Sequence, residues 1–268
     1  MAGLLFQGVV TAACVFPFSS DPHRLRLKRW WSKAMLDILG IRLDADLAHA
    51  VPGSMVVANH VSWLDIFVVN AALPSAFVSK EEVRHWPVMG WLAGINDTIF
   101  LKRGSRGHAR LINAEIAAVL AQGKHVAVFP EGTTTDGTHV LHFHAALLQP
   151  ALLAGRPVVP AAISYWEPDG ERSLAPRYDG DISLGDCLKN ILARRRLVAR
   201  LATTPALGQD GSDRRAVAAA ARAAICTAAA LPPPNNPPER PAGLPVAAPS
   251  DGRPTGNLSP GPGDWAGA

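Results

Sequence analysis

The chain is poor in cysteine and lacks the common signatures of nucleotide binding and serine catalysis. Its three cysteines, Cys14, Cys187 and Cys226, are odd in number and widely spaced, so they form no CxxC pair and no disulfide framework. This usage suits a reducing compartment, where such thiols behave as small apolar residues. The sequence contains no Walker loop, no GxGxxG after a strand and no GxSxG elbow, which argues against a nucleotide-dependent enzyme or a serine hydrolase.

The first 18 residues contain no charged side chain. A secretory signal peptide would begin with a basic segment, whereas here the basic residues come after the apolar run, at positions 24–29. The run is at the short limit of the roughly 20 residues that span a bilayer, and Pro17 shortens it as a helix. We expect a membrane anchor that spans or half enters a bilayer, with the basic flank on the cytoplasmic side. A buried core helix is the alternative.

Residues 24–41 (RLRLKRWWSKAMLDILGI) have apolar side chains every three or four positions, which predicts an amphipathic helix. Trp30 and Trp31 beside basic residues are typical of a helix that lies on phospholipid headgroups. Ordinary packing against the folded domain explains the same pattern. We therefore assign residues 1–44 to an N-terminal membrane anchor with an amphipathic helix.

Short apolar runs alternate with helical patterns through the middle of the chain. This alternation predicts an α/β catalytic domain at residues 45–230, built on a mixed, largely parallel sheet flanked by helices. We expect strands at 54–58, 76–79, 98–101, 125–129, 158–164 and 197–202, and helices at 66–72, 109–121, 188–193 and 213–229.

The end of the chain has a different composition. From residue 231 to residue 268 Pro and Gly dominate and no apolar periodicity remains, so this tail is expected to be disordered. The net charge of +4 and the pI near 9.2 fit nucleic acid, an anionic membrane or an acidic carrier protein equally well.

Polar residues follow the strand that is predicted to end at Ala58. His60 and Asp65 are five positions apart, which is a poor spacing for one helix face. They meet only if His60 lies in the turn before the next helix and Asp65 in its first turn, and Ser62 with Asp65 has the spacing of a capping box. Asp65 can then fix the imidazole while the other ring nitrogen takes a proton from a hydroxyl group. A simple helix cap beside a surface histidine is the alternative.

Two more polar segments follow predicted strands. Residues 129–137 (FPEGTTTDG) contain two glycines, which let the backbone approach a ligand closely. Residues 99–104 (IFLKRG) deliver Lys102 and Arg103, and a guanidinium can hold a phosphate or a carboxylate through two hydrogen bonds. Each segment alone is explained as well by a solvated turn or an exposed charge.

Together these segments resemble the motifs of the PlsC-like glycerolipid acyltransferases, which include 1-acylglycerol-3-phosphate acyltransferases and bacterial lyso-ornithine-lipid acyltransferases. The likeness covers about residues 4–228. Four segments occur in the order and spacing of that family: His60-x4-Asp65, FLKR at 100–103, FPEGT at 129–133 and VVPAAIS at 158–164. The resemblance implies an O-acyltransferase of membrane lipid biosynthesis that moves a fatty acyl group from acyl-ACP or acyl-CoA to a lysolipid hydroxyl.

The resemblance also implies roles for single residues. His60 would be the general base, Asp65 its partner, and Pro160 a residue that shapes the pocket. The acceptor site would be lined by Lys102, Arg103, Glu131, Gly132, Thr133, Thr134 and Asp136. No metal and no cofactor are implied, since the acyl thioester is a co-substrate. The implied partners are the membrane bilayer, an acyl carrier protein or CoA thioester and a lysolipid, and not nucleic acid.

One departure from the family pattern bears on the acceptor. Members that accept a phosphate-bearing lipid usually carry Arg directly after EGT, where this chain has Thr134. A missing guanidinium and the added carboxylate of Asp136 disfavour a phosphate. The TTTDG form looks more like the lyso-ornithine-lipid branch, whose cationic headgroup Asp136 can pair with. Lysophosphatidic acid stays open as the acceptor, because Lys102 and Arg103 remain.

Two alternative functions, metal binding and nucleic-acid binding, stay open. His125, His139, His142 and His144 could form a zinc site, although no acidic or cysteine ligand lies at a typical spacing. The arginines at 194–196 could belong to a basic nucleic-acid-binding module, although a solvated helix face explains them more simply. An inactive scaffold with the same fold is the third alternative, and the presence of both His60 and Asp65 speaks against it.

Overall fold

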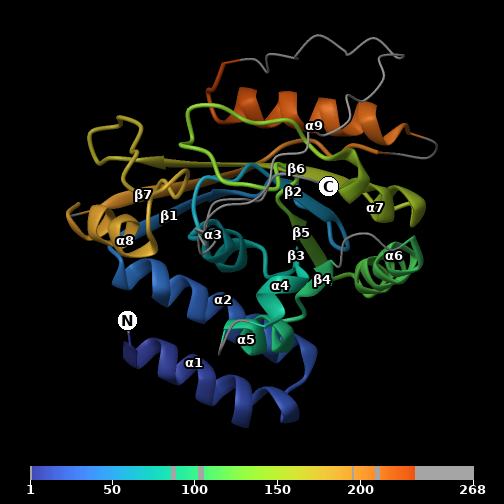
Figure 1. The fold of residues 1–268 in the computed structure, drawn as a ribbon, viewed down its shortest axis with the longest axis horizontal. Coiled ribbons are helices and arrows are strands. Elements are labelled where there is room, and N and C mark those ends of the chain that lie inside the picture. Colours follow the sequence, from blue (N-terminus) through green and yellow to red (C-terminus); the bar gives the residue numbers. More distant parts are fainter. Residues whose placement is uncertain (1, 86–88, 102–105, 195, 209–211, 233–268) are drawn as a thin grey trace, which may run out of the picture.

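A seven-stranded sheet runs through the computed structural model, which describes residues 2–85, 89–101, 106–194, 196–208 and 212–232 (Figure 1). The strand order is β1-β7-β6-β2-β5-β3-β4. The strands are β1 (Ile41–Asp46), β2 (Met55–Ala58), β3 (Ser75–Lys80), β4 (Ile99–Leu101), β5 (His125–Val128), β6 (Val158–Trp166) and β7 (Leu197–Thr203).

The sheet is mixed and mostly parallel, as the sequence predicts. β2, β3, β4, β5 and β6 run in one direction. β7 pairs antiparallel with β6, and β1 pairs parallel with β7, so these two strands run the opposite way. The carboxyl ends of β2 and β5 therefore meet at one edge of the sheet, and the segments that follow them lie side by side.

Helices cover both faces of the sheet (Figure 1). Side chains of α2 (Asp21–Ile38), α3 (Asp65–Ala72) and α8 (Leu184–Leu192) pack on one face with Val56 and Ala58. Side chains of α6 (Arg106–Ala121), α7 (Gln149–Leu153) and α9 (Arg214–Ala228) pack on the other face with Met55 and Val57. Successive strand residues point to opposite faces, so a short apolar run such as β2 serves both layers at once.

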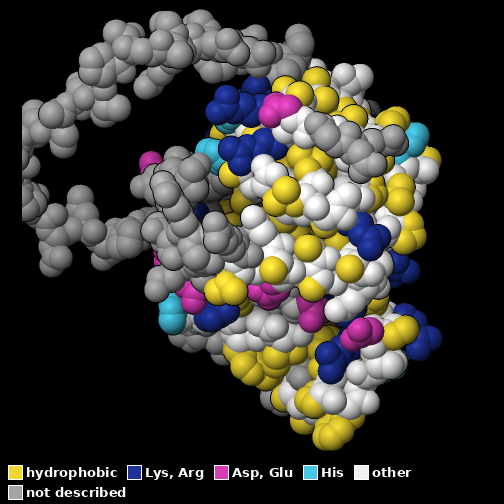
Figure 2. Space-filling model, turned by 90° about the vertical axis from the view of Figure 1, so that its right-hand side faces the viewer, with side chains coloured by type: hydrophobic (Ala, Val, Ile, Leu, Met, Phe, Trp, Pro, Cys, Tyr) yellow, Lys and Arg dark blue, Asp and Glu magenta, His cyan; other side chains and the backbone are white. Residues whose placement is uncertain are grey.

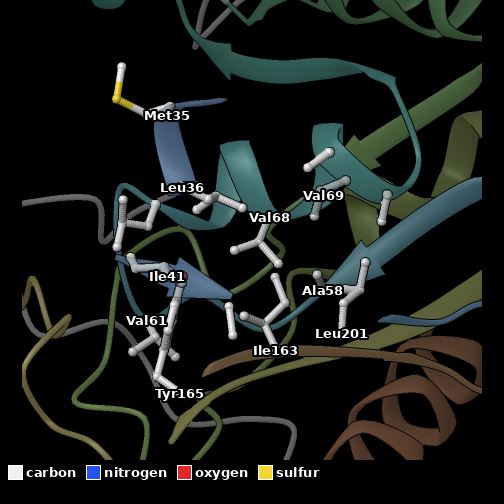
Figure 3. Packing of buried hydrophobic residues seen from close by; sticks show 14 of the residues in the cluster. Met35, Leu36, Ile41, Ala58, Val61, Val68, Val69, Ile163, Tyr165 and Leu201 are labelled. Atoms are coloured by element: carbon white, nitrogen blue, oxygen red, sulfur yellow. The ribbon is translucent and has the colours of Figure 1, made fainter. Parts of the chain in front are cut away.

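The core on the α3 side supports the later site. Figure 3 shows its packing, in which Val68 and Val69 of α3 lie with Ala58 of β2 and with Ile163 and Tyr165 of β6. All five side chains are buried. The first turn of α3 is thereby fixed against the ends of β2 and β6.

The N-terminal elements pack onto this domain. α1 (Ala2–Cys14) is followed by the 3₁₀ helix η1 (Phe16–Phe18) and α2, and α2 packs on α3 through the buried Met35 and Leu36. One face of the predicted interfacial helix is thus a packing face. No helix in the described part of the chain is both long and apolar enough to cross a membrane.

The sequence analysis missed β1. Its sequence, IRLDAD, alternates apolar with charged residues, which is a strand pattern, but the sequence analysis included it in the N-terminal segment at 1–44; most of its residues are exposed because β1 is an edge strand. The sheet therefore begins at Ile41, before residue 45, where the catalytic domain was expected to begin. The expected tail, residues 231–268, lies outside the described residues except for its first two positions. The remaining short helices are α4 (Glu81–Arg84), α5 (Met89–Ile95) and η2 (Ala145–Leu148).

Candidate active site

The turn between β2 and α3 is tied to β6 by Asn59. The Asn59 Nδ2 donates to the Ile163 carbonyl at 2.9 Å, and the Ile163 N–H donates to the Asn59 Oδ1 at 2.8 Å. β2 has no further residue to pair at this point, so the side-chain amide continues the ladder in place of backbone. His60 is thereby held at the carboxyl edge of the sheet.

His60 and Asp65 meet as predicted. The Asp65 carboxylate lies in the first turn of α3 and is fully buried, and its Oδ2 lies 2.8 Å from the His60 Nδ1. The same oxygen accepts the backbone N–H groups of Val61 at 2.7 Å and Ser62 at 2.9 Å. Because the carboxylate cannot rotate without losing these bonds, Nδ1 is fixed as the nitrogen that faces Asp65. None of the described residues forms a hydrogen bond with Nε2, the nitrogen left for a substrate.

The plane of the imidazole is fixed by an aromatic neighbour. The rings of His60 and Phe129 are stacked, with centroids 4.1 Å apart and planes 9° apart. Phe129 in turn stacks on Phe77 of β3 at 5.9 Å. Asp65 therefore fixes the direction in which the His60 Nδ1 points, and Phe129 fixes the plane of the His60 ring.

Glu131 holds the backbone of this site. Its side chain is only 4% exposed, its Oε1 accepts the His60 N–H at 2.7 Å, and its Oε2 accepts the Leu141 N–H at 2.7 Å. Burial raises the pKa of Glu131 to about 7, although both backbone donors act to lower it. The resemblance implied that Glu131 lines the acceptor site, but its carboxylate is bonded to the backbone on both sides.

The raised pKa of Glu131 predicts a pH-dependent stability. Between the ordinary pKa of 4.5 and about 7, the folded state binds more protons than the unfolded state, so the contribution of Glu131 to the free energy of unfolding falls as the pH rises. The Glu131→Gln variant lacks this titration. We expect the stability of the wild type relative to this variant to be lower at about pH 7.5 than at about pH 5 by about 2 kcal/mol.

Urea unfolding at the two pH values measures this difference. The exposed Glu115 of α6 provides the matched control, because Glu115→Gln should change stability equally at both pH values. An equal difference for Glu131→Gln at both pH values would show that Glu131 titrates normally.

The turn after β5 wraps around His60. The Thr135 N–H donates to the His60 carbonyl at 2.9 Å, and the Thr134 hydroxyl donates to the Tyr178 carbonyl. Gly137 has φ +81°, and a Cβ there would lie 3.1 Å from Val61. Both the conformation and the close approach thus require glycine. Gly132 also has a positive φ, of 72°, and its N–H closes the turn onto the Phe129 carbonyl.

Asp136 is at the open side of this turn. Its Oδ1 accepts the N–H and the hydroxyl of Thr138, and it lies 3.3 Å from the Nδ1 of His139. Partial burial acts to raise the pKa of Asp136, but the Thr138 hydrogen bonds outweigh it, so the pKa is below its ordinary value. Asp136 is thus a half-buried anion that directly follows Thr135, whose N–H bonds to His60. Thr133, in the same turn, is also half-buried.

One predicted site residue, Pro160, does not lie at the His60–Asp65 pair. Pro160 pairs with Val57 in the body of the sheet, and its alternation with Val158 and Ala162 places it on the α9 face, away from α3. Lys102 and Arg103 lie outside the described residues.

The predicted histidine cluster does not assemble. His125 is the first residue of β5, and its Nδ1 contacts the Ser54 hydroxyl. This contact lies at the amino edge of β5, opposite the carboxyl edge where His60 lies. His142 and His144 have ring centroids 6.2 Å apart and lie beyond that end. Within the described ranges, no three His, Cys, Asp or Glu residues are grouped so that they could hold a metal ion. Of the basic run, Arg194 is paired with Glu167 at 3.6 Å.

The sequence analysis missed Tyr165. It ended the strand at Ser164, whereas β6 continues to Trp166, and the Tyr165 hydroxyl donates to the Asp65 Oδ1 at 2.7 Å. The signal was present in the alternation of Ala161, Ile163 and Tyr165, which share the face that α3 covers.

Comparison with known proteins agrees with this geometry. The acyltransferase family model matches residues 45–164. A 1-acyl-sn-glycerol-3-phosphate acyltransferase of Neisseria meningitidis is 39% identical over 63% of this chain and 65% of its own length, just under two thirds of that protein. A lyso-ornithine lipid O-acyltransferase of Pseudomonas aeruginosa is 39% identical over 74% of this chain and 76% of its own length.

The fold also has a solved counterpart. The crystal structure of the 1-acyl-sn-glycerophosphate acyltransferase PlsC of Thermotoga maritima superposes with a TM-score of 0.59, covering 84% of this chain and 92% of that one at 22% identity. At this identity the likeness concerns the fold alone. The family match and the Pseudomonas relative, which is matched over three quarters of its length, lead to one assignment: the chain belongs to the PlsC-like family of lysolipid acyltransferases.

Proposed function

We propose that this protein transfers a fatty acyl group from an acyl thioester, carried by acyl carrier protein or by CoA, to the hydroxyl group of a lysolipid. The observation that carries the proposal is the contact of the His60 Nδ1 with a buried carboxylate that also accepts two backbone N–H groups. Such a carboxylate can stabilise the imidazolium that forms when Nε2 takes a proton.

The reaction balances with these two side chains. His60 Nε2 removes the proton of the lysolipid hydroxyl, and the oxygen attacks the thioester carbonyl. The carbon–sulfur bond then breaks, and the thiolate leaves with the proton that His60 carried. The base regains its starting state, and the products are a fully acylated lipid and a free thiol. The proposal includes no covalent acyl-enzyme and no cofactor beyond the acyl thioester.

To test this proposal, the purified protein is incubated with labelled acyl-ACP or labelled acyl-CoA and with each lysolipid of a panel. Labelled diacyl product with at least one acceptor is expected. Thioester hydrolysis with no acylated lipid would instead identify a thioesterase and overturn the proposal.

For the acceptor we favour a lyso-ornithine lipid over lysophosphatidic acid. The TTTDG turn has Thr134 where a phosphate-binding Arg would lie, and the Thr134 hydroxyl is bonded to the Tyr178 carbonyl. Asp136, with a lowered pKa and a side chain that is 28% exposed, offers a negative charge to a cationic headgroup. The Neisseria relative, named for a phosphate acceptor, makes lysophosphatidic acid the competing choice.

Asp136→Asn tests the acceptor. Asparagine keeps the Oδ1 that accepts from Thr138, so the turn is retained while its charge is lost. We expect kcat/KM for a lyso-ornithine lipid to fall roughly tenfold. This corresponds to the loss of one partly exposed charge contact worth about 1.4 kcal/mol. The rate with lysophosphatidic acid should stay the same or rise.

The matched control is Asp46→Asn. The Asp46 Oδ1 accepts the Ala48 N–H in a similar local turn, but it does so at the end of β1, on the opposite edge of the sheet. An equal loss with both acceptors in Asp136→Asn would mean that Asp136 supports the turn and does not select the headgroup.

We also propose that the protein works on the cytoplasmic face of the inner membrane, docked through its N-terminal helices. Figure 2 shows hydrophobic side chains gathered at the lower end of the molecule, over α1 and η1, with charged side chains above them. Phe18 of η1 is 90% exposed and Trp30 of α2 is 52% exposed. This arrangement fits a surface that enters the headgroup region.

Phe18→Ser should weaken the binding of the full-length protein to vesicles of anionic phospholipid, measured by co-sedimentation, by about tenfold or more, because burial of one Phe side chain is worth roughly 1.5–3 kcal/mol. Leu153→Ser is the control, since Leu153 is also 70% exposed but lies on α7. If both variants bind the vesicles as well as the wild type does, η1 is not part of the docking surface.

A further inference from the structure

Tyr165 contacts the His60–Asp65 pair from the core side, through Asp65. It is the second-to-last residue of β6 and is 2% exposed, among the largest side chains that the core encloses completely. Its hydroxyl oxygen lies 2.7 Å from the Asp65 Oδ1, which is the carboxylate oxygen that faces away from His60. β6, α3 and the turn after β2 thus converge on a single carboxylate.

The direction of this hydrogen bond follows from chemistry. Burial and the neighbouring Asp65 charge raise the pKa of the Tyr165 hydroxyl well above its ordinary value, so the hydroxyl keeps its proton. An ionised carboxylate only accepts hydrogen bonds. Tyr165 is therefore the donor and Asp65 the acceptor.

The two oxygens of Asp65 are used unequally. Oδ2 accepts from the His60 ring and from the backbone N–H groups of Val61 and Ser62. Oδ1 accepts from Tyr165, and among the described residues this is its one hydrogen bond. The Tyr165 hydroxyl thus fixes the rotation of the carboxylate about its last side-chain bond, and it draws negative charge toward Oδ1, away from the imidazole.

We propose that Tyr165 is a positioning residue that acts through Asp65 to set the orientation and the proton affinity of His60. This inference rests on the proposed function and deepens it by extending the His60–Asp65 pair to a chain of three side chains. The hydroxyl group carries the effect, and the ring serves the core.

Tyr165→Phe tests the role of the hydroxyl, because it keeps the ring that packs in the core. We expect kcat to fall roughly tenfold with the KM values for both substrates unchanged, as for the loss of one hydrogen bond to a charged group. With its second oxygen unpaired, Asp65 presents more negative charge to His60. The acidic limb of the pH–rate profile should therefore move to higher pH.

Other titratable groups near Asp65 must be separated from this effect. They are Glu131 in the turn after β5 and Cys187 on α8, in addition to His60 itself, and Arg222 of α9 acts on Glu131. Because Glu131 titrates near pH 7, the profile is measured also in the Glu131→Gln background. The limb should move by the same amount there.

Ser164→Ala is the matched control. The Ser164 hydroxyl is also buried and hydrogen-bonded, to the Trp166 Nε1 at 2.9 Å, but on the other face of β6. It should lower the free energy of unfolding about as much as Tyr165→Phe does while it leaves kcat and the pH profile unchanged. Tyr165→Phe with an unchanged kcat and an unmoved limb would refute the inference.

A second readout separates this inference from the proposed function. The His60 ring signal in NMR, assigned by its loss in His60→Gln, should titrate at higher pH in Tyr165→Phe than in the wild type. This shift requires no enzymatic activity. Absence of acyl transfer in the wild type would overturn the proposed function and leave the coupling testable by NMR, whereas an active wild type with an unshifted His60 titration in Tyr165→Phe would overturn the coupling alone.

Discussion

Replacement of Asp65 by asparagine is expected to lower kcat by about 10³- to 10⁴-fold while the fold is retained. The asparagine oxygen can take the place of Oδ2 and accept from His60, Val61 and Ser62. The side-chain NH₂ then faces the Tyr165 hydroxyl oxygen, which can accept a hydrogen bond. The contacts of His60, Val61 and Ser62 survive, and the Tyr165 contact is reversed, because its hydroxyl oxygen now accepts; the negative charge that would stabilise the imidazolium is gone.

Steady-state acyl transfer and thermal unfolding measure the two halves of this expectation. Asp213→Asn is the control, because the Asp213 carboxylate also accepts two backbone N–H groups at a helix start, those of Arg215 and Ala216, with no histidine involved. If Asp65→Asn retains more than about a tenth of the wild-type activity, Asp65 serves only as a helix cap.

Removal of the base itself, in His60→Ala, should reduce acyl transfer by about 10²- to 10⁴-fold, the range that positioned general-base catalysis contributes. The His60 ring is partly exposed, so its loss leaves an open hollow beside Phe129 instead of a sealed cavity, and the fold should be retained. Added imidazole should restore part of the activity. Cys14→Ala, on α1, should have little effect.

His49→Ala is the matched control, since His49 is exposed and follows β1 at the opposite edge of the sheet. Full activity in His60→Ala would refute the assignment of His60 as the base, and so would an equal loss in both variants.

Much of this site was predictable because each of its parts follows a short apolar strand. β2 and β5 are fully or mostly buried, and their runs of Val and Ala admit few other assignments. Since parallel strands end at the same edge, the segments at 59–65 and 129–137 were expected at one edge of the sheet, and the pairing of β2 with β5 makes them neighbours. The five-residue spacing of His60 and Asp65 then required a turn followed by a helix start, and this is what the structure has.

The errors have physical causes as well. β1 alternates apolar with charged residues, but it is only six residues long, mostly exposed, and overlaps the end of the predicted amphipathic helix, so it was included in the N-terminal segment. The resemblance placed Glu131 in the acceptor site, whereas its contacts in the structure are with two backbone N–H groups, which compensate the burial of its carboxylate. A contact across 100 positions, such as that of Tyr165 with Asp65, leaves no trace in local spacing.

The resulting site is rigid for a simple reason. Each group that orients His60 is itself fixed by backbone: Asp65 by two N–H groups, Asn59 by both polar groups of Ile163, and Glu131 by two segments of chain. A base that is pre-oriented in this way loses little freedom when the substrate arrives. In the proposed function, the acceptor is selected at the 132–137 turn.

The most direct test of the catalytic pair is a double-mutant cycle in which acyl-transfer rates are measured for the wild type, His60→Ala, Asp65→Asn and the double variant. If the carboxylate acts only through the imidazole, the double variant should be no slower than His60→Ala alone. Losses that multiply, so that the double variant is slower by the product of the two single effects, would contradict a single base assembled from these two side chains.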